Sequence, residues 1–273
     1  MRTVTRAREG RALGYARVAL GLIFLARTTP LLFFVGAPFG AQTSPLLGWP
    51  SAEWTVALPG MALPGGLVAS LCVLRTIAAA LFTCGIRGRA SGIVAAGCGY
   101  VVLAQDRFAF INSLHVLFLA TFVVALTSAP SAVALVPDRV VQGEVASSVR
   151  FVSVVLASIY FWAGAAKVQP EWLFGHALEA QARAGAFAGP LGSLVERASV
   201  RTVASWTVPT LELGVALLLL ADRRRVASVL ALVFHVVVEL TVMPDTLGWQ
   251  MAVLLFAIWP RPAETVAARR AGR

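Results

Sequence analysis

The chain has 273 residues, of which 58% are hydrophobic and only 13% are charged, and its formal net charge is +10. Soluble domains normally carry about 25% charged residues, so this composition excludes an ordinary soluble domain and indicates an integral membrane protein. The positive charge does not indicate nucleic-acid binding. The basic residues lie in short clusters between apolar segments, as they do in the cytoplasmic loops of membrane proteins.

Apolar segments long enough to cross a hydrocarbon core of roughly 30 Å recur along the whole chain. Inside a bilayer each segment must satisfy its own backbone hydrogen bonds, so we expect helices. The predicted fold is all-α, a single polytopic helical bundle over residues 1–273 with about eight transmembrane helices. The expected spans are residues 12–36, 64–86, 91–105, 108–128, 150–168, 203–221, 226–243 and 246–260. The first span resembles a signal peptide in its basic start, but its length and two internal arginines favour a retained helix.

The arginines predict the orientation of these spans. With a cytoplasmic N-terminus, fifteen arginines fall in the inner segments and four in the outer segments, which is the bias of the positive-inside rule. Both termini are then cytoplasmic. Richness in alanine and arginine suggests a bacterium of high GC content, and hence its cytoplasmic membrane. The outer segments 37–63 and 169–200 carry tryptophans. The second mixes apolar and charged residues, which predicts an interfacial helix or a re-entrant hairpin.

Several ionisable residues lie inside the expected spans, where each one is costly and usually has a function. We expect most of them to line one cavity that opens outward. They are Arg17, Arg27, Arg75, His115, Lys167, Glu212, His235 and Glu239.

Lys167, at the outer end of the fifth expected span, is the only lysine among the 23 Lys and Arg residues. A lysine in an apolar site can lose its proton and act as a base, whereas arginine stays protonated. The alternative is a lysine that reaches from a span end to the membrane surface. Tyr160 and Gly164 share its helical face, and the small residues around Gly164 would allow close approach of a helix or a flat ligand.

The remaining polar residues support weaker interpretations. Asn112 and His115 lie on one face of the fourth span, and His235 and Glu239 are spaced to pair on the seventh; each could be only a structural contact. Arg75 either balances the charge of Glu212 or Glu239 or binds an anionic group. We predict no metal site, because the ligands are too few. The three cysteines lie in apolar segments and indicate no disulfide framework.

The segment 160–167, Tyr-Phe-Trp-Ala-Gly-Ala-Ala-Lys, followed by Trp172-Leu173 and Gly175, resembles a signature of the vitamin K-dependent gamma-carboxylase. It is similar also to its bacterial relatives, the horizontally transferred transmembrane domain (HTTM) proteins. Three weaker matches follow in the expected order, and together the resemblance covers most of the chain. They are Asn112 to His115, the leucine-rich segment around Glu212, and Phe234-His235.

The resemblance implies a membrane enzyme that uses a reduced naphthoquinone and oxygen to form a strong base, which removes a glutamyl proton before carbon dioxide attaches. It implies Lys167 as the base toward the quinone and His115 as its assistant. It also implies a quinone or substrate site around Tyr160, Gly164, Trp172, Asn112, His235, Glu212, Arg75 and Glu239.

Departures from the carboxylase limit what the resemblance implies. This chain has Ala166-Lys167 where the carboxylase has two lysines, and no segment matches its large lumenal region. A short peptide, a lipid or a small molecule is therefore a better expected substrate than a large protein. Two other hypotheses remain: a non-enzymatic membrane protein for export, immunity or partner assembly, and a small-solute transporter, for which the repeated halves common in transporters are missing.

Overall fold

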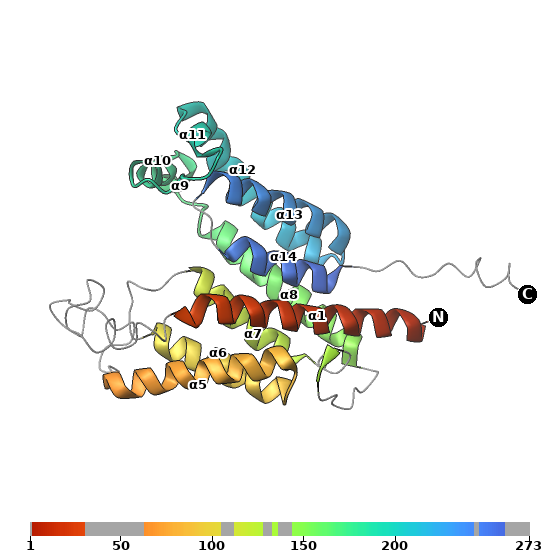
Figure 1. Ribbon diagram of the computed structural model, residues 1–273. Coiled ribbons are helices and arrows are strands. Elements are labelled where there is room, and N and C mark those ends of the chain that lie inside the picture. Colours follow the sequence, from red (N-terminus) through yellow and green to blue (C-terminus); the bar gives the residue numbers. More distant parts are fainter. Residues whose placement is uncertain are drawn as a thin grey trace, which may run out of the picture. The chain divides into compact units, whose positions relative to one another are not determined.

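The computed structural model describes residues 2–30, 63–104, 112–127, 133–135, 144–242 and 246–259. Within these ranges every helix or strand element is an α-helix, and a helix overlaps each of the eight expected spans (Figure 1). Residues 31–36 of the first expected span lie outside the described residues. These helices are α1 (Arg2–Thr28), α5 (Gly65–Cys84), α6 (Gly88–Leu103), α7 (Asn112–Leu126), α8 (Glu144–Ala165), α12 (Ala198–Leu220), α13 (Arg224–Thr241) and α14 (Leu247–Ile258). The predicted outer loop 37–63 lies almost entirely outside the described residues.

The length and hydropathy of the helices support a membrane location. Within the described part of the chain, three helical segments are long and apolar enough to cross a bilayer: Gly66–Cys84, Val145–Ala165 and Ala198–Leu220. Shorter apolar helices follow the same pattern over Gly88–Leu103, Ser113–Leu126 and Leu247–Ile258. The exposed surface includes many large hydrophobic side chains, such as Val203, Leu217 and Val233. Lipid tails, unlike water, impose no cost on such a surface.

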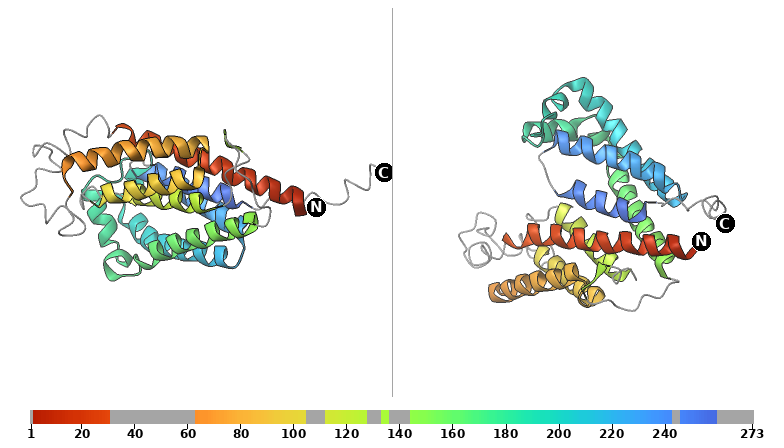
Figure 2. Two further views of the ribbon diagram at one scale, coloured as in Figure 1. Left: turned by 90° about the horizontal axis from the view of Figure 1, so that it is seen from below. Right: turned by 45° about the vertical axis from the view of Figure 1, so that its right-hand side comes forward.

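The chain divides into two compact units, residues 2–148 and residues 149–273. In the first unit, α1 packs against α5 and α7, and α6 packs against the same two helices. The four helices therefore form a closed ring of neighbours, and Figures 1 and 2 show them running alongside one another. The interior of this unit is filled by side chains such as Leu20, Phe24, Phe82 and Phe118.

A buried arginine fixes one corner of the first unit. Arg17 of α1 donates from Nη1 to the carbonyl oxygen of Phe82 at 3.1 Å and from Nη2 to that of Val133 at 3.2 Å. Phe82 lies in the last turn of α5, and its carbonyl oxygen also accepts from the Gly85 N–H at 3.0 Å. The guanidinium therefore adds a second bond at this helix end, which gives this intramembrane charge a structural role.

In the second unit, α13 packs against both α12 and α14. Three short helices connect α8 to α12: α9 (Pro170–Leu173), α10 (His176–Arg183) and α11 (Gly192–Val195). Figure 1 shows them gathered at one end of α12, and they pack on it. The segment predicted as one interfacial helix or hairpin is thus a set of short helices, because Gly175 and Gly185 at positive φ interrupt it.

Candidate functional site

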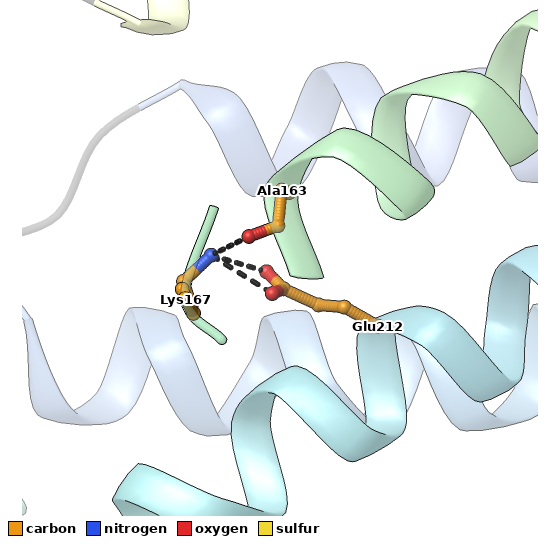
Figure 3. Close-up of polar contacts among 3 residues, drawn as sticks. All are labelled: Ala163, Lys167 and Glu212. Carbon is orange, nitrogen blue, oxygen red and sulfur yellow. Dashed lines mark hydrogen bonds and ion pairs between the residues drawn. The ribbon is translucent and has the colours of Figure 1, made fainter. Parts of the chain in front are cut away.

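The candidate site lies at the C-terminal end of α8. Lys167 lies in the turn that follows α8, and its Nζ donates to both carboxylate oxygens of Glu212 on α12, at 2.9 Å to Oε1 and 2.8 Å to Oε2 (Figure 3). A third bond runs from Nζ to the carbonyl oxygen of Ala163 at 2.9 Å. This carbonyl belongs to the last turn of α8, so the amine also caps that helix.

Burial is unequal across the Lys167–Glu212 pair. The side chain of Lys167 is 22% exposed, whereas that of Glu212 is 7% exposed. Lys167 is therefore the more exposed member of the pair, and Glu212 is almost fully buried.

Glycine explains how the two helices come close enough for this contact. A Cβ atom at Gly164 would lie 2.9 Å from Cγ of Leu213 and 3.2 Å from Cβ of Glu212. Atoms of α12 therefore fill the space that a side chain at position 164 would need. Of the two uses expected for the small residues here, close approach of a helix is the one observed at Gly164.

An aromatic side chain completes the surroundings of the amine. The Lys167 Nζ lies 5.4 Å from the ring centroid of Trp172 on α9, within the range of a cation–π contact. The indole Nε1 of Trp172 is buried and has no hydrogen-bond partner among the described residues. A buried donor without an acceptor is costly, so this N–H is a candidate contact for a bound ligand.

A second polar pair lies in the same unit. Tyr160 Oη and His235 Nε2 share a hydrogen bond of 2.9 Å between α8 and α13. Both residues are almost fully buried, at 3% and 8% exposed. Tyr160 and Gly164 of α8 contact α13 and α12 respectively, whereas Lys167, expected on the same helical face, lies in the turn after α8 and contacts α12 from there.

Two pairings considered from the sequence differ from the contacts in the structure. His235 bonds Tyr160 rather than Glu239, and a Cβ at Gly248 would lie 2.6 Å from Oε1 of Glu239. Glu239 therefore lies against the N-terminal turn of α14, where the helix dipole favours a carboxylate. Glu212 is balanced by Lys167, so it does not depend on Arg75 for its counter-charge.

His115 and Arg75 lie in the first unit, and both make contacts with other residues of that unit. Tyr100 Oη donates to the His115 carbonyl oxygen at 3.0 Å, and the two rings meet edge to face. Arg75 is 2% exposed and donates from Nη2 to the Thr28 carbonyl oxygen at 3.5 Å. The side chain of Asn112 lies outside the described residues.

Sequence reasoning missed Ser205. This side chain is fully buried and donates to the carbonyl oxygen of Leu173 at 3.0 Å, which ties α12 to α9 and so positions Trp172. Pro209 lies in the next turn of α12 and cannot donate to the Ser205 carbonyl. A serine one turn before a proline is the only sequence signal, and it is too common to be specific.

These contacts and the apolar helices define an integral membrane helical domain with a largely buried lysine–glutamate pair at the end of one of its helices. The chain belongs to the HTTM domain family, whose model matches residues 6–259. No curated protein and no solved structure matches the chain. Among the described residues, no group of three or more His, Cys, Asp or Glu side chains could hold a metal.

Proposed function

We propose that this protein is a membrane-embedded enzyme of the carboxylase or oxygenase type, in which Lys167 acts as a base toward a reduced quinone. One observation carries the proposal. The only lysine of the chain contacts a buried carboxylate on one side and an indole with an unpartnered N–H on the other.

The proposed topology has eight spans, both termini in the cytoplasm and the Lys167 site toward the outer surface of a bacterial cytoplasmic membrane. The position of eight helices at the expected spans supports it, and so does the distribution of arginines under the positive-inside rule. With short outer segments, the proposed acceptor is a small molecule, a lipid or a short peptide.

Base chemistry requires that the Lys167 amine lose a proton. Glu212 Oε2 is the acceptor at hand, 2.8 Å away. Transfer of one proton from Nζ to the carboxylate converts an ion pair into a neutral amine and a carboxylic acid. In a poorly hydrated site the neutral pair avoids the cost of two buried charges. Glu212 then stores the proton while the more exposed amine faces the ligand.

The residues around the amine fit a quinone. The Trp172 face offers a stacking surface, and its buried Nε1–H offers a donor for a ring oxygen. When bound, a reduced naphthoquinone supplies an acidic hydroxyl and the electrons that oxygen chemistry needs. Lys167 accepts the hydroxyl proton, and the helix contact at Gly164 holds the lysine turn in place. We propose Tyr160, His235 and Glu239, which lie in the same unit as Lys167, as further residues of the quinone or substrate site.

The test measures product directly. Vesicles containing the protein receive reduced naphthoquinone, oxygen and bicarbonate, and quinone epoxide is quantified by mass spectrometry. Wild type is expected to form epoxide. Lys167→Arg keeps the charge and the contact with Glu212 but cannot act as a base, so it is expected to lose at least about 100-fold in rate, the lower range for a positioned base.

Arg183→Gln is the matched control. It removes a basic side chain from α10 in an exposed pair with Glu179 and is expected to keep wild-type activity. Equal epoxide formation by wild type and Lys167→Arg would contradict the base assignment. Co-purification of a partner protein that is unaffected by Lys167→Ala, without epoxide, would favour the non-enzymatic alternative.

A further inference from the structure

The first unit contains a buried arginine, Arg75, whose guanidinium makes few hydrogen bonds within the described residues. Arg75 is 2% exposed, and the only hydrogen bond it makes within the described residues is the 3.5 Å contact with the Thr28 carbonyl oxygen. That distance is well beyond the usual 2.9–3.0 Å of an N–H···O bond. Its Nε is buried without a partner.

Arg17 provides a comparison within the same unit. It is equally buried and its Nε also has no partner, but both of its terminal nitrogens donate to carbonyl oxygens at 3.1 and 3.2 Å. Arg17 thus has a structural role in capping a helix. Arg75 has one weak carbonyl contact in place of two good ones.

The composition around Arg75 sharpens the contrast. Among the described residues, the thiols of Cys72 and Cys98 lie in electrostatic range of the guanidinium. Arg27, next to Thr28 in the chain, adds a second cation and donates to Ser113 Oγ at 3.4 Å. A buried guanidinium without an anionic partner is strongly unfavourable.

We propose that Arg75 is the centre of a binding site for a small oxyanion, such as a carboxylate or inorganic phosphate, that is separate from the Lys167–Glu212 pair. The Nε–Nη edge of a guanidinium matches two oxygens of such a group. Ser113 and Arg27 supply further polar groups at the same end of α1.

The depth of Arg75 selects a small anion over a lipid headgroup. Arg75 lies at the middle of α5 (Gly65–Cys84), roughly 15 Å from each end at 1.5 Å per residue. A phospholipid phosphate sits at the membrane surface and does not reach that level. We therefore expect the site to bind a small anion, or a substrate carboxylate, that enters the helical bundle.

The test uses the purified full chain in neutral detergent at constant ionic strength. Its melting temperature is followed while chloride is replaced by acetate, bicarbonate or phosphate. Wild type is expected to show a saturable rise, because a ligand that binds only the folded state stabilises it. Arg75→Lys keeps the charge but loses the paired geometry, so its half-saturating concentration should rise at least about tenfold. Arg17→Lys is the control and is expected to bind like wild type.

Arg75→Met gives an independent readout. It removes the unbalanced charge, so in chloride it should be at least as stable as wild type and should not respond to oxyanions. An equal response of wild type and Arg75→Lys would show a general salt effect and overturn the proposal. Severe destabilisation of Arg75→Met in chloride would overturn it as well, because the guanidinium would then be balanced within the protein. Stabilisation by phosphatidylglycerol nanodiscs over phosphatidylcholine, without any effect of small anions, would assign the site to a lipid instead.

Discussion

Replacing Glu212 by glutamine isolates the energetic role of the ion pair. The change keeps the size of the side chain but leaves the Lys167 amine opposite a neutral amide. Breaking a buried pair by removing one partner typically costs about 3–5 kcal/mol. Here Lys167 is 22% exposed and can turn part of its charge toward water. We therefore expect a smaller loss of unfolding free energy for Glu212→Gln, about 2–3 kcal/mol.

A double-mutant cycle with Lys167→Met checks this value. Both single variants and the double variant are unfolded in the same detergent, and the coupling free energy is taken from the four stabilities. The double variant has no uncompensated charge, so it should recover much of the loss, with a coupling of about 1–3 kcal/mol. A coupling below about 0.5 kcal/mol, within the additivity of independent sites, would refute the conclusion that the two groups stabilise each other.

Three further predictions concern packing and hydrogen bonds. Gly164→Ala places a Cβ 2.9 Å from α12 and should destabilise the protein by about 1–3 kcal/mol. Gly214→Ala is the control: nothing lies within 4 Å of its added Cβ, so it should be neutral or stabilising by up to about 1 kcal/mol. Thermal unfolding compares the two variants, and equal melting temperatures would contradict the close contact at Gly164. Tyr160→Phe leaves His235 without its partner and should cost about 1–3 kcal/mol, measured by denaturant unfolding; an unchanged midpoint would show that the bond contributes nothing. Arg17→Met removes two bonds to carbonyl oxygens and should cost about 1–3 kcal/mol, with hydrogen exchange rising first at the end of α5; exchange that rises uniformly would argue against a local capping role.

Helix positions could be predicted well because the bilayer selects apolar length. The segment expected at 64–86 is the helix Gly65–Cys84. Starting points were predicted less well: α8 begins at Glu144 rather than 150, and α12 at Ala198 rather than 203. Hydropathy detects the lipid-facing part of a helix, whereas helical hydrogen bonds continue into polar flanking residues that carry no such signal.

The candidate site, too, could be predicted only in part from the sequence. Lys167 could be singled out because it is the only lysine of an arginine-rich chain, and Gly164 because small residues permit close helix contact. The partner of Lys167 could not be chosen. Glu212 is 45 residues away in sequence, and Arg75 was an equally reasonable counter-charge for it.

By itself, the sequence determined the membrane environment, the approximate places of the apolar helices, and the residue types that carry charge within them. These properties depend on local composition, which a bilayer reads segment by segment. Only the tertiary structure decided which charges meet, that Glu212 is the more buried partner of Lys167 and that His235 bonds Tyr160. Such pairings depend on how helices distant in sequence pack and rotate against one another, and hydropathy contains no information on that.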